Sequence, residues 1–203
     1  MREDFFIVVA SGGGLYKYDE QNRSFTQVHS GMNPNEQVEF LIYKENLYFG
    51  STKDVWRRFD GGNKTYKVGG DQPPKKFKKI IFNPYAGRFF GIIDDSLYWS
   101  NHIDQGGMEV WPDANIQLID SINGDRPQTI DTFEGRITII GDHSINSGTV
   151  LGVPENWSFQ REKANEGCIA FRTVKRYGNS FYMLNPQFEL MKWPENQSIS
   201  LGS

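Results

Sequence analysis

The residues that could carry chemistry are few and lie far apart in the sequence. The three histidines are His29, His102 and His143, and none has a second histidine or a cysteine at metal-ligand spacing. The single cysteine, Cys168, opens an apolar stretch, which is typical of a buried and inert thiol. We therefore predict no metal site, no cofactor, no internal disulfide and no Ser-His-Asp or Cys-His catalytic set.

Aspartates recur at one turn position of the repeat described below. Propeller glycosidases use two carboxylates about 5 to 9 Å apart. Aspartate also stabilises turns, because its side chain bonds the nearby backbone. Repetition at a single structural position favours turn formation, so we predict that the protein is not an enzyme and keep a glycosidase as the last alternative. The aspartates concerned are Asp54, Asp94, Asp95 and Asp142.

Two further motifs suggest ligand binding but have a plainer interpretation. Gly12-Gly13-Gly14 leads into a strand-like segment rather than a Lys-Ser/Thr pair and a helix, so it predicts a hairpin turn and not a phosphate loop. Lys75 to Lys79 holds one phenylalanine among lysines, a pattern that can bind single-stranded nucleic acid. It also precedes a strand, and the net charge is only −3. We therefore favour a solvated loop, with no nucleic-acid partner. The sequons at Asn22, Asn63, Asn156 and Asn196 are interpreted as turns.

The composition predicts that these residues sit on many short strands. The 203 residues include 21 glycines and 9 prolines, and 14% of the chain is aromatic. Helix interiors exclude glycine and proline, so the composition argues against a helical bundle. The longest apolar run, Phe5 to Ala10, is far too short for a membrane-spanning helix, and no signal peptide is expected.

Apolar strands joined by polar turns recur along the whole chain. The first apolar residue after each turn falls at Leu15, Val55, Leu97, Ile145 and Phe188, at spacings of 40, 42, 48 and 43 residues. Four short strands per period of this length are typical of a β-propeller blade. The candidate first strands between the units are Val38 to Tyr43, Lys79 to Phe82, Thr129 to Phe133 and Cys168 to Tyr177. We predict an all-β fold, a β-propeller of five blades with about four antiparallel strands each. It forms one domain over residues 1–203, with units at approximately 1–34, 35–75, 76–126, 127–166 and 167–203.

Three details refine the predicted propeller. The runs Leu47 to Phe49 and Ile137 to Ile140 are apolar on successive residues, so both faces of these strands should be buried. The first unit begins at its second strand, and Ser198 to Leu201 either closes the ring by pairing with that unit or forms the outer strand of its own unit. A helix over Asn35 to Phe49 is the alternative to two strands, which its Val, Phe, Ile and Tyr residues favour.

One part of the sequence resembles a recurring blade in virion proteins of tailed bacteriophages. The resemblance covers about residues 110 to 193, with departures at Phe171 and Pro186-Gln187. It rests on the segments Asn115 to Ile119, Gly124-Asp125, Ile130 to Gly141, Ser144-Ile145, Pro154 to Trp157, Gly167 to Ala170 and Tyr182 to Leu184.

The resemblance implies a non-enzymatic structural protein of the phage tail or nozzle. Its expected partners are other virion proteins and copies of itself, and its expected location is the virion, assembled in the host cytoplasm. Some large aromatics could anchor a partner, although packing between blades is the simpler role. The candidates are Trp99, Trp111, Trp157 and Trp193. A carbohydrate-binding propeller lectin or receptor-binding domain remains the first alternative, because sugars stack on aromatic rings.

Overall fold

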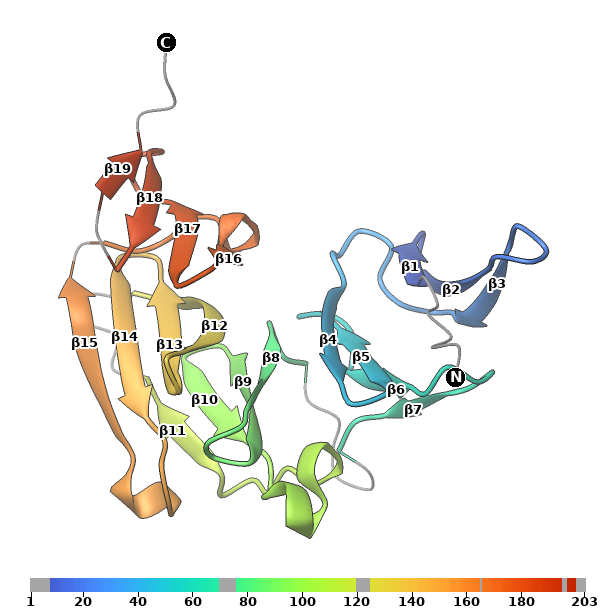
Figure 1. Ribbon diagram of the computed structural model, residues 1–203, viewed down its shortest axis with the longest axis horizontal. Helices are drawn as coiled ribbons and strands as arrows, with labels where there is room; N and C mark the ends of the chain where they lie inside the picture. Colours follow the sequence, from blue (N-terminus) through green and yellow to red (C-terminus); the bar gives the residue numbers. More distant parts are fainter. Residues whose placement is uncertain (1–7, 70–75, 120–124, 165, 195–196, 200–203) are drawn as a thin grey trace. The chain divides into compact units, whose positions relative to one another are not determined.

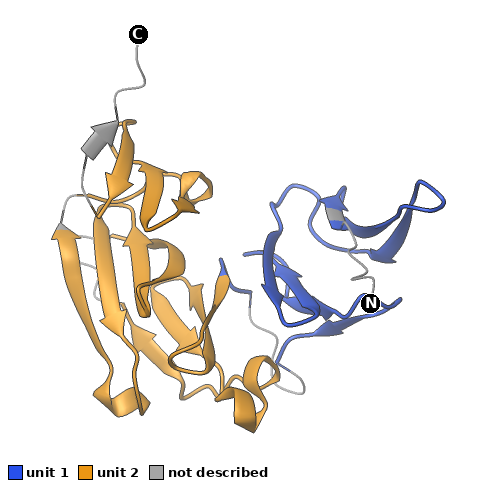
Figure 2. Cartoon of the chain, viewed as in Figure 1, with its two compact units in different colours: residues 1–79 blue, residues 80–203 orange. Residues whose placement is uncertain are grey.

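A computed structural model describes residues 8–69, 76–119, 125–164, 166–194 and 197–199 of the chain (Figure 1). Its regular structure consists of five antiparallel sheets and a few short 3₁₀ helices, so the all-β prediction is confirmed. The chain divides into two compact units, Met1–Lys79 and Ile80–Ser203 (Figure 2). The described residues contain no helix that is long and apolar enough to cross a membrane. One domain over the whole chain stays a prediction.

The first unit contains sheets 1 and 2. Among the described residues sheet 1 has three strands, as expected for a unit that begins at its second strand. They are β1 (Val8–Ser11), β2 (Gly14–Asp19) and β3 (Ser24–His29). Sheet 2 has four strands, β4 (Glu39–Tyr43), β5 (Asn46–Gly50), β6 (Arg57–Phe59) and β7 (Thr65–Lys67). Residues 39–50 therefore form two strands, and the helical alternative is wrong.

A two-glycine turn joins the first two strands. Gly12 and Gly13 have φ angles of 56° and 79°, and the residues on either side, Ser11 and Gly14, pair with each other. Two successive positive φ angles are typical of a type I′ hairpin, which L side chains rarely adopt. A Cβ atom on Gly13 would also lie 2.5 Å from the carbonyl oxygen of Met32. The glycine run is thus a hairpin turn, as the sequence predicts.

Sheet 1 packs on sheet 2 through a shared apolar cluster. The cluster comprises the buried residues Leu15, Met32, Leu47, Phe49 and Phe59, with the partly buried Val8, Ala10, Val28 and Val38 around them. Leu47 and Phe49 alternate with the equally buried Tyr48, which points to the opposite face of β5. Both faces of this strand are therefore covered, as its unbroken apolar run predicts.

The second unit contains sheets 3, 4 and 5, each a four-stranded antiparallel meander. Sheet 3 comprises β8 (Ile80–Asn83), β9 (Arg88–Ile93), β10 (Ser96–Trp99) and β11 (Ile116–Leu118). Sheet 4 comprises β12 (Pro127–Phe133), β13 (Arg136–Gly141), β14 (Ser144–Thr149) and β15 (Ser158–Ala164). Sheet 5 comprises β16 (Lys175–Tyr177), β17 (Ser180–Leu184), β18 (Leu190–Trp193) and β19 (Gln197–Ile199).

Sheet 4 lies between sheets 3 and 5 and is buried on both faces (Figure 1). Because neighbouring residues of a strand point to opposite faces, Ile137 and Ile139 meet sheet 3 while Ile140 meets sheet 5. The cluster towards sheet 3 includes Ile81, Phe90, Ile92, Leu97, Trp99, Ile130 and Val150. The cluster towards sheet 5 includes Phe133, Ile145, Cys168, Phe181, Met183, Met191 and Trp193.

Hydrogen bonds also join the first strands of these three sheets. The Thr132 hydroxyl on β12 donates to the Phe82 carbonyl of β8 at 3.5 Å. The Asn83 side chain donates to the Gly135 carbonyl at 3.1 Å. The Arg176 guanidinium on β16 donates to the Thr132 carbonyl at 2.7 Å. The first strand of each sheet therefore lies beside the first strand of the next.

One predicted strand is wrong, and one pair of alternatives is decided by the structure. The apolar stretch Cys168 to Tyr177 was expected as one strand, but only Lys175–Tyr177 is a strand. The Thr173 hydroxyl donates to the Ala170 carbonyl at 2.7 Å and helps to fold the preceding residues into a 3₁₀ turn. At the other end, Gln197–Ile199 pairs with β18 and is the outer strand of its own sheet. Ser200 and Leu201 lie outside the described residues.

Candidate functional site

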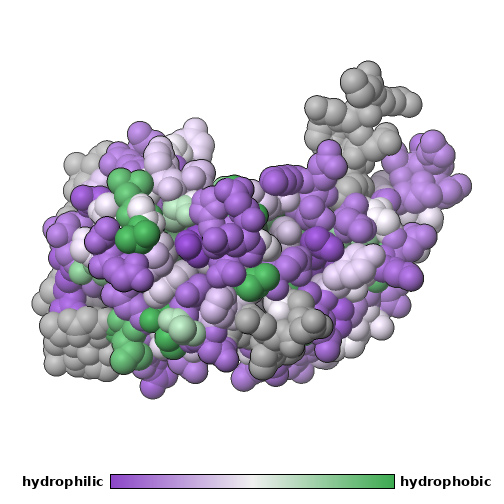
Figure 3. Space-filling view, turned by 90° about the horizontal axis from the view of Figure 1, so that it is seen from below, coloured by the Kyte–Doolittle hydropathy of each residue, from purple (hydrophilic) through white to green (hydrophobic). Residues whose placement is uncertain are grey.

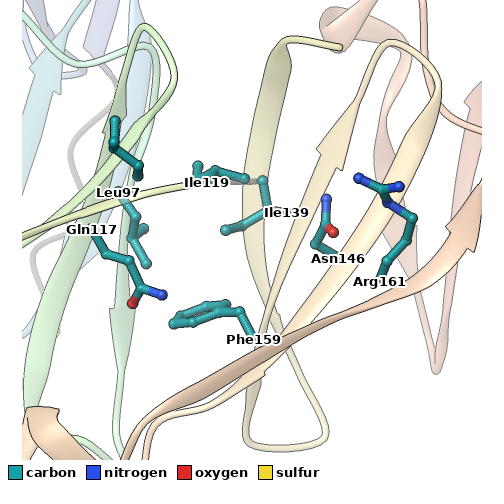
Figure 4. A pocket seen from close by; sticks show the side chains of 8 residues that line it. Leu97, Gln117, Ile119, Ile139, Asn146, Phe159 and Arg161 are labelled. Carbon is teal, nitrogen blue, oxygen red and sulfur yellow. The ribbon is translucent and has the colours of Figure 1, made fainter. Parts of the chain in front are cut away.

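A small pocket opens between the outer strands of sheets 3 and 4 (Figure 4). Its volume is about 120 Å³, which is room for a few water molecules or one small group. Figure 4 shows Gln117 on the side of sheet 3, and Asn146 and Arg161 on the side of sheet 4. Leu97, Leu118, Ile119, Ile139 and Phe159 complete the lining.

The pocket is equipped for binding rather than for catalysis. Its described lining contains amide groups and a guanidinium but no carboxylate, imidazole, thiol or hydroxyl group. It therefore lacks a nucleophile and an acid–base pair, which a hydrolytic site would need. An amide and a guanidinium above apolar side chains can hold a carbonyl or carboxylate group.

A buried carboxylate next to this pocket fixes the turn between β13 and β14. Asp125 is 7% exposed; its Oδ1 accepts the His143 backbone N–H at 2.8 Å, and its Oδ2 accepts the Ser144 hydroxyl. The Ser144 oxygen in turn accepts the Asn146 side-chain amide at 3.1 Å. Asn146 is thereby held at the pocket wall. In the sequence, Gly124-Asp125 stands out only through the phage resemblance, because the partners of Asp125 lie 18 and 19 residues away.

The predicted turn aspartates make contacts within their turns or tie those turns to neighbouring segments. Asp54 accepts the Ser51 hydroxyl at 2.8 Å and the Asn33 backbone N–H at 2.9 Å. Asp94 has a φ angle of 49°, and the Asp95 carbonyl accepts the Ile119 N–H at 2.9 Å. Asp142 accepts the Gln128 side-chain amide at 2.5 Å. These contacts support turn formation, and the glycosidase alternative gains no acid–base pair from them.

The histidines are likewise occupied by local contacts. His102 accepts the Asp104 N–H at 3.3 Å and caps a 3₁₀ helix, Ile103–Gln105. His143 uses its backbone for Asp125, while His29 Nδ1 lies 3.2 Å from the Thr65 hydroxyl oxygen. Burial, followed by the nearby Arg57, lowers the pKa of His29 below its ordinary value of 6.5. Across the described residues, no group of three or more His, Cys, Asp or Glu residues could hold a metal ion.

The tryptophan candidates lie mostly inside the protein. Trp99, Trp111 and Trp193 are 7%, 2% and 6% exposed, and Trp157 packs against Trp99 with ring centroids 5.0 Å apart. The Trp111 ring N–H donates to the Met108 carbonyl at 2.5 Å. These positions support the packing role, and a role in anchoring a partner stays a prediction. The sequence could not distinguish the two roles, because both place large aromatics at strand ends.

The remaining motifs have structural roles where they are described. Phe77 of the lysine cluster is 1% exposed and its carbonyl accepts the Trp56 ring N–H at 2.9 Å, so its ring cannot stack on a base. Cys168 is a buried free thiol, as predicted. Asn22 donates to the Asp19 carboxylate at 2.7 Å within a turn. Asn63 is exposed, Asn156 lies in a 3₁₀ helix, and Asn196 lies outside the described residues.

Comparison with known proteins relates the chain to solved structures only. No family model and no curated protein matches it. It is similar to the extracellular domain of BT4673 from B. thetaiotaomicron, with a TM-score of 0.56 and 12% identity over 90% of this chain and 25% of that chain. It is also similar to PorZ, a surface component of the type-IX secretion system of Porphyromonas gingivalis. That TM-score is 0.51, with 13% identity over 93% of this chain and 25% of that chain.

These similarities concern the fold and not the activity. The identities of 12% and 13% are too low to carry a function, and the chain spans a quarter of the length of each relative. Both relatives are bacterial, one an extracellular domain and the other a surface component. Neither is named as a phage protein, so the resemblance to tailed-phage virion proteins stays a prediction.

Proposed function

We propose that the five sheets are blades of a β-propeller, and that this rigid propeller is a non-enzymatic packing module between protein subunits of a phage tail. The observation that carries the proposal is the two-sided burial of sheet 4. A four-stranded sheet covered on both faces by its neighbours is a unit of a stack, and stacking around an axis is how propeller blades bury their faces. The adjacent first strands of sheets 3, 4 and 5 agree with such an axis.

The hydrogen bonds of the aspartate side chains agree with a scaffold role. The carboxylate of Asp54 binds a hydroxyl of its own turn, and those of Asp125 and Asp142 bind side chains of neighbouring strands. The exposed face drawn in Figure 3 is mainly hydrophilic with small hydrophobic areas. The location in the virion rests on the sequence resemblance over residues 110 to 193.

The lectin alternative has weaker support. It depended on tryptophan rings at the blade ends, and three of the four candidates are buried. A sugar needs an exposed ring face on which to stack.

Two measurements test the proposal. Particles of the encoding phage, purified on a density gradient, should contain this chain at a fixed ratio to a tail subunit in every infectious fraction. Quantitative mass spectrometry reads that ratio, and absence of the chain from particles rejects the virion role. The propeller itself predicts one cooperative thermal transition of the full chain. Fragments 1–79 and 80–203 that each fold alone, with the melting temperatures of the parent, would instead show two separate domains.

A further inference from the structure

Three polar side chains form a continuous contact between sheets 1 and 2. His29 is the last residue of β3, Arg57 is the first residue of β6, and Thr65 is the first residue of β7. His29 Nδ1 lies 3.2 Å from the Thr65 hydroxyl oxygen, and the Arg57 guanidinium donates to the same oxygen at 3.4 Å. One hydroxyl group therefore joins an imidazole of sheet 1 to a cation of sheet 2.

The direction of these hydrogen bonds favours a neutral His29. Arginine has donors only, so the Thr65 oxygen accepts from Arg57. The hydroxyl proton of Thr65 then remains available for His29 Nδ1, which accepts a proton only in the neutral imidazole. A protonated His29 would instead direct an N–H at an oxygen that already faces a guanidinium, and the two like charges would repel each other.

The surroundings of the imidazole favour the same neutral form. His29 is half-buried, and its ring lies against that of Phe49 with ring centroids 5.8 Å apart. Arg57 pairs with both Phe49 and Lys67, and directly paired residues point to the same face of a sheet. Phe49 belongs to the cluster between the two sheets, so both cations lie on the face of sheet 2 that meets sheet 1.

A nearby carboxylate and a lysine complete the charged groups on this face. Asp54, in the turn before β6, raises the pKa of His29, but burial and Arg57 outweigh it and the pKa lies below 6.5. The oxygens of Asp54 accept the Ser51 hydroxyl and a backbone N–H, which fixes the carboxylate in its turn. On the side of sheet 1, the Lys17 ammonium donates to the Gly61 carbonyl at 2.8 Å.

The outer strand of sheet 2 is the element that such a contact can hold or release. Within the described residues β7 pairs only with β6, over three residue pairs. Its side chains Tyr66 and Lys67 are exposed, while Thr65 is half-buried. Segments with few buried contacts open at a low free-energy cost. A change at His29 can therefore alter the attachment of β7 while the apolar cluster stays packed.

We propose that the contact between β3 and β7 is an acid-sensitive latch, which holds the outer edges of sheets 1 and 2 together while His29 is neutral and opens when its imidazole takes up a proton. Histidine is suited to this role because it changes charge near neutral pH. The pKa of His29 is lower in the closed latch than in a solvated imidazole. The latch is therefore closed above pH 6.5 and opens progressively as the pH falls below that value.

Hydrogen–deuterium exchange of the full chain, read by mass spectrometry at pH 7.5 and 5.5, tests the latch. After correction for the intrinsic exchange rate, we expect the protection of residues 57–67 to fall about threefold or more at the lower pH. Residues 136–141 of sheet 4 are the internal reference and should change little. His29→Gln keeps a polar partner for Thr65 without the titration, so it should abolish the fall. His143→Gln is the matched control, because His143 is exposed, and it should behave like the parent.

A second measurement follows the proton itself. The midpoint of the His29 ring signal in an NMR titration should lie below 6.5, and the His29→Gln variant identifies that signal. Arg57→Gln removes the neighbouring charge and should raise the midpoint. Thr65→Val removes the hydroxyl that donates to the neutral ring, so it should raise the midpoint as well and lower the protection of β7 at pH 7.5. Circular dichroism checks that each variant is folded, and His29→Asn replaces His29→Gln if that variant unfolds.

Three outcomes overturn the proposal. An unchanged protection of residues 57–67 between the two pH values, or an equal fall in His29→Gln, shows that His29 does not control β7. An equal fall in residues 136–141 shows that acid loosens the whole protein rather than this contact. A His29 midpoint at or above 6.5 shows that the closed contact does not favour the neutral ring.

Discussion

Ile137 and Ile145 offer a direct test of the two-sided burial on which the proposed scaffold depends. Both side chains are fully buried, Ile137 in the cluster towards sheet 3 and Ile145 in the cluster towards sheet 5. Replacing a buried isoleucine with alanine costs about 2–5 kcal/mol, from lost transfer free energy and the cavity left behind. We therefore expect Ile137→Ala and Ile145→Ala each to lower the free energy of unfolding by about 3 kcal/mol.

A matched control distinguishes burial from residue type. Ile42 is 77% exposed, so Ile42→Ala should change the free energy of unfolding by no more than about 0.5 kcal/mol. The assay is urea denaturation followed by tryptophan fluorescence. Four of the five tryptophans lie after residue 80, so the signal reports mainly the unit that contains sheet 4.

The two clusters should also act independently. Ile145 pairs with Ile140, three residues along β13 from Ile137, which places the two side chains about 10 Å apart on opposite faces. Ile137→Val and Ile145→Val should each cost about 0.5–1.5 kcal/mol, and the double variant should equal their sum within about 0.5 kcal/mol. A loss below about 1 kcal/mol for either alanine variant would mean that one face of sheet 4 is open, and would refute the stacked arrangement.

Three further predictions concern single contacts. Asp125→Ala leaves the buried Ser144 hydroxyl and the part-buried His143 N–H without their acceptor and should cost about 1–3 kcal/mol, whereas Asp125→Asn should cost less; thermal denaturation at pH 7 measures both. Gly167→Ala would bring a Cβ atom to 2.4 Å from the Gly141 carbonyl oxygen and should cost about 1–3 kcal/mol, whereas Gly62→Ala, which approaches only a flexible side chain, should cost less than 1 kcal/mol. Because the pKa of His29 is lower in the folded protein, the unfolded chain binds the proton more readily. The contribution of His29 to stability is therefore fully present above pH 6.5 and decreases as the pH drops below 6.5. His29→Gln should remove that part of the slope when urea midpoints at pH 7.5 and 5.5 are compared.

The strands and their turns could be predicted because the signals are local. An unbroken apolar run such as Ile137 to Ile140 indicates a strand with two covered faces, whatever covers them. Gly12-Gly13 predicts a hairpin, because few residues adopt two successive positive φ angles. The stretch from Cys168 was predicted less well, since a threonine side chain bonds the backbone three residues earlier and replaces part of the expected strand with a turn.

The roles of individual side chains were decided by residues distant in the sequence. The tryptophans could have been inside or outside on their spacing alone, and packing against residues far along the chain, such as Trp157 for Trp99, decides which are buried. Asp125 binds the Ser144 hydroxyl inside the protein only because the fold brings the turn at Ser144, 19 residues later, next to it.

The contrast between Phe40 and Ile130 shows the same division. Both are apolar residues at the same register of a first strand, and the sequence by itself determined that each points to a sheet face. Only the tertiary structure decided that β8 covers Ile130 while Phe40 remains partly exposed. Strand period and turn chemistry are properties of a few adjacent residues, whereas burial depends on which other strand arrives, and that strand can come from far along the chain.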